Sequence, residues 1–90
     1  MRLDKYLKVS RIIKRRTVAN DACDLGRVMI NGKTAKPSSE VKIGDVLDIR
    51  LGSGTICVKV LSIQEHALKS DANLMYELIN KRFTDNIYPR

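Results

Sequence analysis

The side chains of this chain that could do chemistry are cationic, and they are concentrated near its start. Residues 2–36 carry ten of the 17 Lys and Arg but three of the ten Asp and Glu, so the whole net charge of +7 falls in this segment. Such a polarised excess of positive charge favours a polyanionic partner. The candidate binding residues, one of which is a neutral amide, are Arg2, Lys5, Lys8, Arg11, Lys14, Arg15, Arg16, Asn20, Arg27, Lys33 and Lys36.

Other kinds of site find little support in the sequence. His66 is the single histidine, and Cys23 and Cys57 lie far apart with no CxxC spacing. Neither the GxGxxG nor the GxxxxGK[ST] pattern of phosphate-binding loops occurs, and no His/Cys cluster has metal-ligand spacing. We therefore expect no catalytic residue, no metal site, no cofactor, and two reduced, buried thiols.

The composition is that of a single folded, soluble domain. Hydrophobic residues make up 43% of the chain and charged residues 30%, and with 4% aromatic residues the core must be aliphatic. The longest apolar run, residues 56–63, is interrupted by Lys59 and is much shorter than the roughly 20 residues of a bilayer span. The N-terminus lacks the apolar segment of a secretory signal. We expect a cytoplasmic protein that binds no membrane.

Two helices are predicted at the start of the chain. Leu3 and Leu7 recur at helical spacing, with Tyr6 beside them, which predicts a first helix to about residue 10. Thr17 is a suitable N-cap for a second helix, and Gly26 a suitable stop. The apolar stripe expected on the second helix consists of Val18, Ala19, Ala22, Cys23 and Leu25.

After the second helix the apolar period changes to that of strands. Val28 and Ile30 alternate before Asn31-Gly32, which is the strongest short signal for a hairpin turn. Residues 46–51 alternate in the same way, which predicts a strand with one buried face. That face consists of Leu47, Ile49 and Leu51.

The C-terminal part is expected to add a third strand over residues 55–63 and a last helix. An apolar stripe at helical spacing predicts this helix over about residues 72–82, with Asp71 as its cap. The predicted order is α-α-β-β-β-α, an α+β fold, followed by a fraying tail. The predicted stripe consists of Leu74, Met75, Leu78 and Ile79.

The placement of the cations on these elements indicates a nucleic-acid backbone. The run Lys14-Arg15-Arg16 precedes the second helix, where free N–H groups and the helix dipole also favour phosphate. Other cations lie on the first helix and beside the hairpin, so all three clusters could share one side. We expect one continuous basic face.

Folded RNA is a better candidate than duplex DNA. A helix that reads the DNA major groove needs base-reading side chains, but the exposed face of the second helix offers Asn20, Asp21 and Asp24, two of them anionic. Cations at its two ends would instead clamp phosphates and read shape. A small DNA-binding regulator and an accessory subunit of an RNA-modifying enzyme remain as alternatives.

Four motifs in combination resemble the S4 domain, a small RNA-binding fold. They are the opening RLDKYL, the RR-T start of the second helix, the hairpin GRVMINGK and the strand GDVLDI. The resemblance runs from Arg2 to about Leu51. It implies an S4 core over residues 1–51, with two N-terminal helices (the αL motif) on a small antiparallel sheet. Residues 52–90 would pack the third strand, the C-terminal helix and the tail on the same core.

As a short stand-alone S4 protein, this chain is similar to the S4 proteins of ribosome-associated quality control. Those proteins are related to the bacterial ribosome-associated heat-shock S4 proteins. This resemblance implies a non-catalytic, cytoplasmic, ribosome-associated protein, which we expect to be a monomer. Its partners would be large-subunit ribosomal RNA, tRNA and a factor that adds an untemplated alanine tail to the stalled nascent chain. A general module for structured RNA or tRNA is the alternative.

The same resemblance ranks the candidate residues. Arg2 and Arg16 match the family's RNA-contacting arginines, and Lys14 and Arg15 lie in the same matched motif as Arg16. Asp4 lies in the opening motif, where it is expected to contact RNA, to cap the first helix or to pair with Lys8 four residues on.

Overall fold

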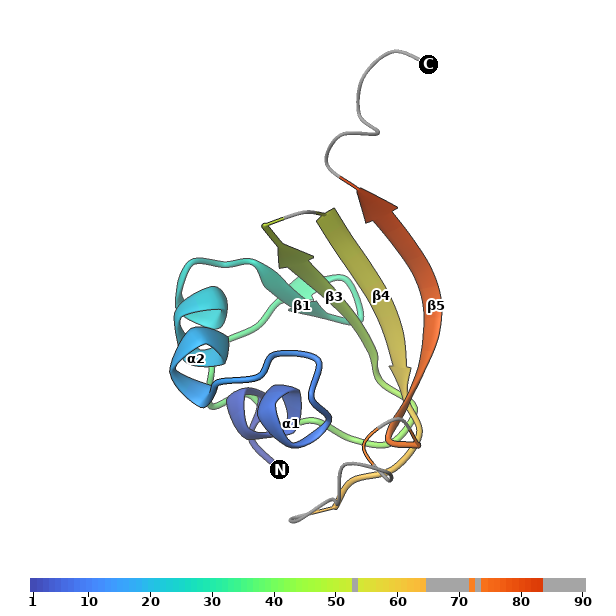
Figure 1. The fold of residues 1–90 in the computed structure, drawn as a ribbon. Coiled ribbons are helices and arrows are strands. Elements are labelled where there is room, and N and C mark those ends of the chain that lie inside the picture. Colours follow the sequence, from blue (N-terminus) through green and yellow to red (C-terminus); the bar gives the residue numbers. More distant parts are fainter. Residues whose placement is uncertain (53, 65–71, 73, 84–90) are drawn as a thin grey trace, which may run out of the picture.

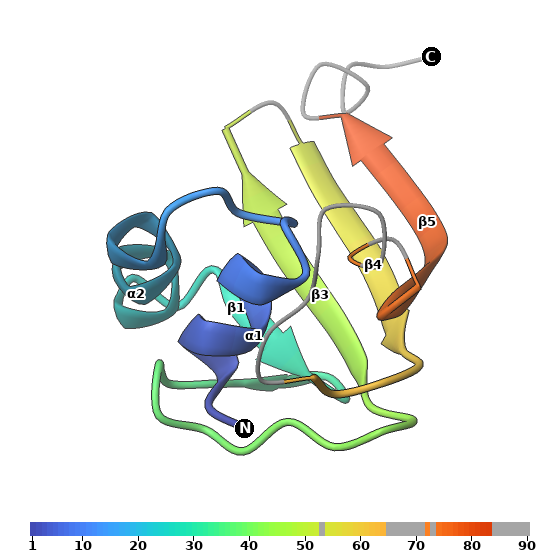
Figure 2. The ribbon, with the colours of Figure 1, turned by 60° about the horizontal axis from the view of Figure 1, so that its bottom comes forward.

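The computed structural model describes residues 1–52, 54–64, 72 and 74–83. Two helices lie together on one face of an antiparallel sheet of five strands, ordered β2-β1-β3-β4-β5 (Figures 1 and 2). The predicted α+β fold, with two N-terminal helices on a small antiparallel sheet, is confirmed. The elements are α1 (Leu3–Val9), α2 (Arg16–Asp24), β1 (Val28–Ile30), β2 (Lys33–Thr34), β3 (Val46–Leu51), β4 (Gly54–Val60) and β5 (Tyr76–Phe83).

Helix α1 is built as its sequence predicts. Leu3, Tyr6 and Leu7 are fully buried and lie on one face of the helix. The Tyr6 hydroxyl donates to the carbonyl oxygen of Met75 at 2.6 Å. Because Met75 directly precedes β5, this bond ties the first helix to the last strand.

Helix α2 differs from its prediction at its start and on its face. The helix begins at Arg16, and neither Thr17 nor any other side chain caps it. Its buried residues are Ala19, Ala22 and Cys23, whereas Val18 is 51% and Leu25 66% exposed. Small side chains face inward because α2 packs closely against α1, and the bulkier Val18 and Leu25 are left outside.

The end of α2 and the hairpin follow their local signals. Gly26 has φ 73° and the Arg27 N–H donates to the Ala22 carbonyl at 2.9 Å, which is a Schellman stop. Asn31 and Gly32 both have positive φ, 52° and 83°, as a type I′ hairpin turn requires. Both predictions are confirmed, and the stop fixes the backbone of Arg27.

Strand β3 divides the sheet into a buried and an open face. Leu47 and Ile49 are fully buried and Leu51 is partly buried against the core, as predicted. The alternating residues of β3 therefore face away from the helices. Strand β4 also forms where a third strand was predicted, but it ends at Val60 rather than at Ile63.

The predicted C-terminal helix is wrong, because residues 76–83 form strand β5. This strand pairs with β4 from Val60↔Tyr76 to Gly54↔Phe83, with a bulge in β5 between the pairs Cys57↔Asn80 and Val58↔Leu78. The edge of β4 presents unpaired N–H and C=O groups, and pairing them outweighs a local helical pattern. Asp71, the predicted cap, and the tail from residue 84 lie outside the described residues.

The predicted apolar stripe of that helix is divided accordingly. Met75 is fully buried, whereas Leu74, Leu78 and Ile79 are 66%, 53% and 52% exposed. The four residues recur at helical spacing in the sequence, but they do not pack together into the core.

Candidate nucleic-acid interface

The centre of the candidate site is a buried carboxylate in the first turn of α1. Asp4 is 2% exposed. Arg2, at the N-cap position, donates to both of its oxygens, from Nε to Oδ1 at 3.3 Å and from Nη2 to Oδ2 at 3.2 Å. The backbone N–H of Lys5 donates to Oδ1 at 2.7 Å. The carboxylate thus satisfies one N–H of the helix start and holds the Arg2 guanidinium.

Helix α2 brings two more of the candidate residues to the same carboxylate. Asn20 donates from Nδ2 to Oδ2 of Asp4 at 3.3 Å, and Nη2 of Arg16 lies 3.5 Å from Oδ1. Arg2 and Arg16 therefore meet on one anion although they come from different helix starts. Their side chains are 53% and 49% exposed, so Arg2 has one edge of its guanidinium hydrogen-bonded, Arg16 has one nitrogen beside the carboxylate, and about half of each side chain is open to solvent.

The charge state of Asp4 follows from these contacts. Burial raises the pKa of the carboxyl, but the hydrogen bonds from Asn20, Arg2 and the Lys5 N–H, together with the charge of Arg16, bring the pKa below its usual value. The carboxylate is ionised at neutral pH. Two guanidinium groups against one carboxylate leave the cluster with a net positive charge.

The expectations for Asp4 need correction in part. The carboxylate faces Arg2, Arg16 and Asn20 rather than Lys8. It does accept one free N–H of the helix start, as a capping group would, although it is not at the N-cap position. Because it is buried, its role is to position the two arginines, which the sequence did not reveal.

The segment of residues 39–41 holds the backbone of Arg2 in place by hydrogen bonds on both sides. The Met1 amino group pairs with Glu40 at 2.7 Å, the Val41 N–H donates to Met1 at 2.9 Å, and the Leu3 N–H donates to Ser39 at 2.8 Å. Arg2 and Glu40 form an isolated antiparallel bridge between these bonds. The start of the chain is therefore fixed on both sides of Arg2, and Glu40 is a contributor that sequence reasoning missed.

A shallow hollow of about 270 Å³ adjoins the cluster at the start of α2. It is lined by Asp4, Arg16, Thr17, Asn20 and Asp21. The first N–H groups of a helix have no partner within the helix and attract anions. The Arg16 guanidinium lines this hollow together with the carboxylates of Asp4 and Asp21, so an anion there would meet one cation beside two acids.

The other candidate cations lie at several places on the fold. Lys8, Arg11, Lys14 and Arg15 are exposed on the end of α1 and on the connection to α2. Lys36 is exposed beside Pro37, whose carbonyl accepts the Asp4 N–H at 3.1 Å.

Two cations of the predicted face lie elsewhere, and one is partly covered. Arg27 follows the far end of α2, away from Arg16, and Lys33 is exposed on β2. Lys5 is half-buried. The geometry therefore joins Arg2, Arg16 and Asn20 directly, and leaves Arg27 and Lys33 apart from them.

The cysteines and the helices add no further chemistry. Cys23 is buried as predicted, and burial together with the charges of Asp4 and Asp24 raises the pKa of its thiol to about 11. Cys57 likewise carries a thiol but is half-buried rather than buried. Within the described ranges, no helix has the length and apolar character needed to cross a bilayer.

The fold and the motifs now identify the class of protein. Residues 1–47 match the S4 domain family. The chain therefore belongs to the S4-domain family.

Comparison with individual proteins is more specific. The chain is 51% identical to the RQC P-site tRNA stabilizing factor of Streptococcus pneumoniae over 97% of this chain and 100% of that protein. It is 52% identical to the protein of that name from Listeria monocytogenes, over 94% and 92% of the two chains. A solved trimeric structure of Vibrio cholerae heat shock protein 15 covers 87% of this chain and 80% of its own at 32% identity, with a TM-score of 0.81.

Proposed function

We propose that this protein is a non-catalytic RNA-binding factor of ribosome-associated quality control. It holds the tRNA of a stalled nascent chain on the obstructed large ribosomal subunit. The observation that carries the proposal is the pair of arginines, Arg2 and Arg16, held on the buried Asp4 in a chain similar over nearly its whole length to proteins named RQC P-site tRNA stabilizing factor.

The arginine pair is suited to phosphate groups on folded RNA. A guanidinium presents several N–H donors in a fixed plane and binds phosphate in a bidentate way. Before RNA arrives, Asp4 holds the Arg2 guanidinium by two hydrogen bonds and pairs with Nη2 of Arg16 at 3.5 Å, so less side-chain freedom is lost on binding. Phosphate contacts set position and register without reading bases. The site would thus recognise the shape of its RNA.

With two arginines exposed on one side, the protein could contact two RNA molecules there. We place a large-subunit ribosomal RNA helix and the tRNA on the Arg2 and Arg16 side, with the surrounding lysines and arginines adding further phosphate contacts. Holding the tRNA keeps the stalled chain in place while a partner factor adds an untemplated alanine tail. The protein would act in the cytoplasm as a monomer, which light scattering at working concentration tests.

Sedimentation with ribosomal particles tests this function. Tagged protein should pellet with split large subunits that carry tRNA, and less with subunits that lack it. The Arg16→Ala variant should lose this binding, whereas Lys59→Ala, which removes an exposed cation of β4, should keep it. Equal binding to intact ribosomes and to free subunits would rule out the quality-control role and leave a general RNA-binding module.

Duplex DNA is the competitor to exclude. The exposed Asp21 and Asp24 give α2 few donors for base edges, which a helix in the DNA major groove needs. In a competition assay, folded RNA should displace the protein from duplex DNA at equal concentration. Preference for the DNA would favour a small regulator instead.

A further inference from the structure

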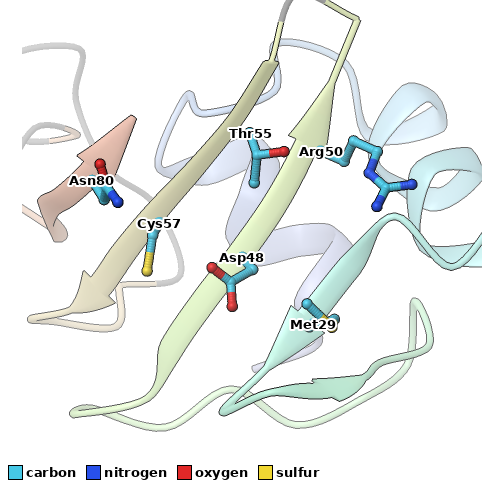
Figure 3. Close-up of a pocket in the computed structure, with 6 residues that line it drawn as sticks. All are labelled: Met29, Asp48, Arg50, Thr55, Cys57 and Asn80. Atoms are coloured by element: carbon cyan, nitrogen blue, oxygen red, sulfur yellow. The ribbon is translucent and has the colours of Figure 1, made fainter. Parts of the chain in front are cut away.

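A second hollow lies on the open face of the sheet. None of its lining residues belongs to the Asp4 cluster. It measures about 460 Å³, and its six lining side chains gather over four strands (Figure 3). The register Met29↔Asp48, Asp48↔Cys57 and Cys57↔Asn80 sets four of them in one row across β1, β3, β4 and β5. Arg50 and Thr55 pair in the next row. The row alternates with Leu47 and Ile49, so it faces away from the helices.

Two arginines form one wall of this open face. A smaller hollow of about 80 Å³ continues from the first and adds Gly26 and Arg27 to the shared residues. The Arg50 N–H donates to the Arg27 carbonyl at 2.9 Å, so these residues are neighbours, and both are exposed. In Figure 3 the Arg50 guanidinium reaches out on the β1 side. No ion pair joins either arginine to an acid among the residues that the structure describes.

A carboxylate lies apart from these cations on the same face. Asp48 is half-buried in the middle of the row, between Met29 and Cys57 (Figure 3). Over the described ranges its side chain makes no hydrogen bond or ion pair. An acceptor and two cations that are kept separate on one face complement a ligand that carries both N–H donors and an anion.

We propose that this face binds one unpaired guanine nucleotide of the RNA. The Asp48 carboxylate accepts the N1–H and the 2-amino group of the base, and Arg27 and Arg50 take the phosphate. The apolar side chain of Met29 lies beside the base. Unpaired bases are the parts of RNA whose hydrogen-bonding edges are open to a protein. This site rests on the proposed RNA-binding function, which it extends to a second face.

The dimensions agree with such a ligand. The 460 Å³ hollow falls within the range of about 300–1,000 Å³ typical of small-ligand sites. Helix α2, which lies between Arg16 and the turn before Arg27, has nine residues and is about 14 Å long at 1.5 Å per residue, a length that a few nucleotides can span. An RNA that follows α2 can therefore contact Arg16 at one end of the helix and Arg27 beyond the other.

Titration of the full ¹⁵N-labelled chain with the RNA pentanucleotides AAGAA and AAAAA tests the proposal by NMR. We expect AAGAA to bind at least about fivefold tighter, the lower range for a bidentate base contact, and to shift the amide signals of Met29, Asp48 and Thr55. Asp48→Asn should abolish the preference for guanine. Arg50→Gln should weaken the binding of both RNAs.

Matched variants on the same face serve as controls. Lys59 and Glu77 are exposed and oppose each other in the β4–β5 ladder, outside the hollow. Glu77→Gln changes the net charge as Asp48→Asn does, and Lys59→Gln as Arg50→Gln does. Glu77→Gln should keep the guanine preference, and Lys59→Gln should weaken binding less than Arg50→Gln.

The outcomes separate this site from the proposed function. Arg16→Ala should reduce sedimentation with large subunits and leave the preference for AAGAA unchanged. Equal affinity for the two pentanucleotides, or a preference that survives Asp48→Asn, overturns the guanine site even if Arg16→Ala still impairs subunit binding. Shifts of the same amides by a peptide containing lysine and aspartate, and by neither RNA, would assign the face to a protein and also overturn the proposal.

Discussion

The guanidinium of Arg2 donates to both oxygens of the buried Asp4 carboxylate, at 3.3 and 3.2 Å. A carboxylate at the centre of the proposed phosphate-binding site lowers the positive charge of that site. Its benefit is geometric, because Arg16 and Asn20 of α2 approach the same group. Two arginines that would move freely on an exposed surface are thereby kept together.

Removal of Arg16 should weaken RNA binding without unfolding the protein. Arg16→Ala should cost about 1.5–3 kcal/mol of binding free energy to a structured RNA, the scale of a hydrogen bond to a charged group. The slope of log K against log salt should fall by about 0.7–0.9 for each phosphate that the variant no longer neutralises. Fluorescence anisotropy with labelled tRNA at several salt concentrations measures both quantities.

The stability of the same variant provides the control. The Arg16 guanidinium lies 3.5 Å from Asp4 and is about half exposed, so the pair contributes less than about 1 kcal/mol to the free energy of unfolding. Arg2→Ala should destabilise more, since it removes two hydrogen bonds to Asp4. An unchanged RNA affinity in both variants would remove Arg2 and Arg16 from the site.

The Asp4 cluster should make stability dependent on acidic pH. The pKa of Asp4 is lowered in the folded state, so its contribution is fully present above the unfolded-state pKa of about 3.9 and is lost as the pH falls through the folded-state value. The difference in free energy of unfolding between the wild type and Asp4→Asn should be constant from pH 7 to about 5 and shrink below pH 4. Urea denaturation across this range checks it; a difference that grows in acid would contradict the assignment.

The hydroxyl of Tyr6 should stabilise the fold without affecting RNA. Tyr6→Phe removes the 2.6 Å bond to the Met75 carbonyl, which also accepts the N–H groups of Leu61 and Ser62 at 2.8 and 3.2 Å. Because that carbonyl keeps other donors, we expect a loss of about 0.5–1.5 kcal/mol in the free energy of unfolding. Chemical denaturation measures the loss. Affinity for tRNA at 20 °C or below, where the variant stays folded, should not change.

Elements with strong local signals were predictable from the sequence. The Gly26 stop and the Asn31-Gly32 turn require positive φ, which few residues adopt, and the structure has both. Helix α1 and the buried face of β3 were also predictable from the spacing of the apolar residues alone. Such features depend on neighbours in the sequence.

The errors arose where distant partners decide the structure. The helical spacing of Leu74, Met75, Leu78 and Ile79 gave way to pairing with the open edge of β4. The inward face of α2 is set by close packing on α1, which selects Ala19 over Val18.

The candidate site shows the same limit. Charge alone placed Arg2 and Arg16 among the candidates, but the role of Asp4 depends on Asn20, 16 residues away. No local pattern links these positions. Helix packing creates the cluster.

Substitution of Asp4 by asparagine tests the central claim most directly. Asp4→Asn raises the net charge above +7, so charge alone predicts tighter binding of tRNA. The loss of two fixed guanidinium groups predicts the opposite, because ordering each side chain on binding costs about 0.5–1.5 kcal/mol. Asp24→Asn, at an exposed position of α2, is the matched control for charge. In anisotropy titrations with tRNA we expect Asp4→Asn to bind about fivefold or more weaker than Asp24→Asn, whereas equal or tighter binding by Asp4→Asn would contradict the account.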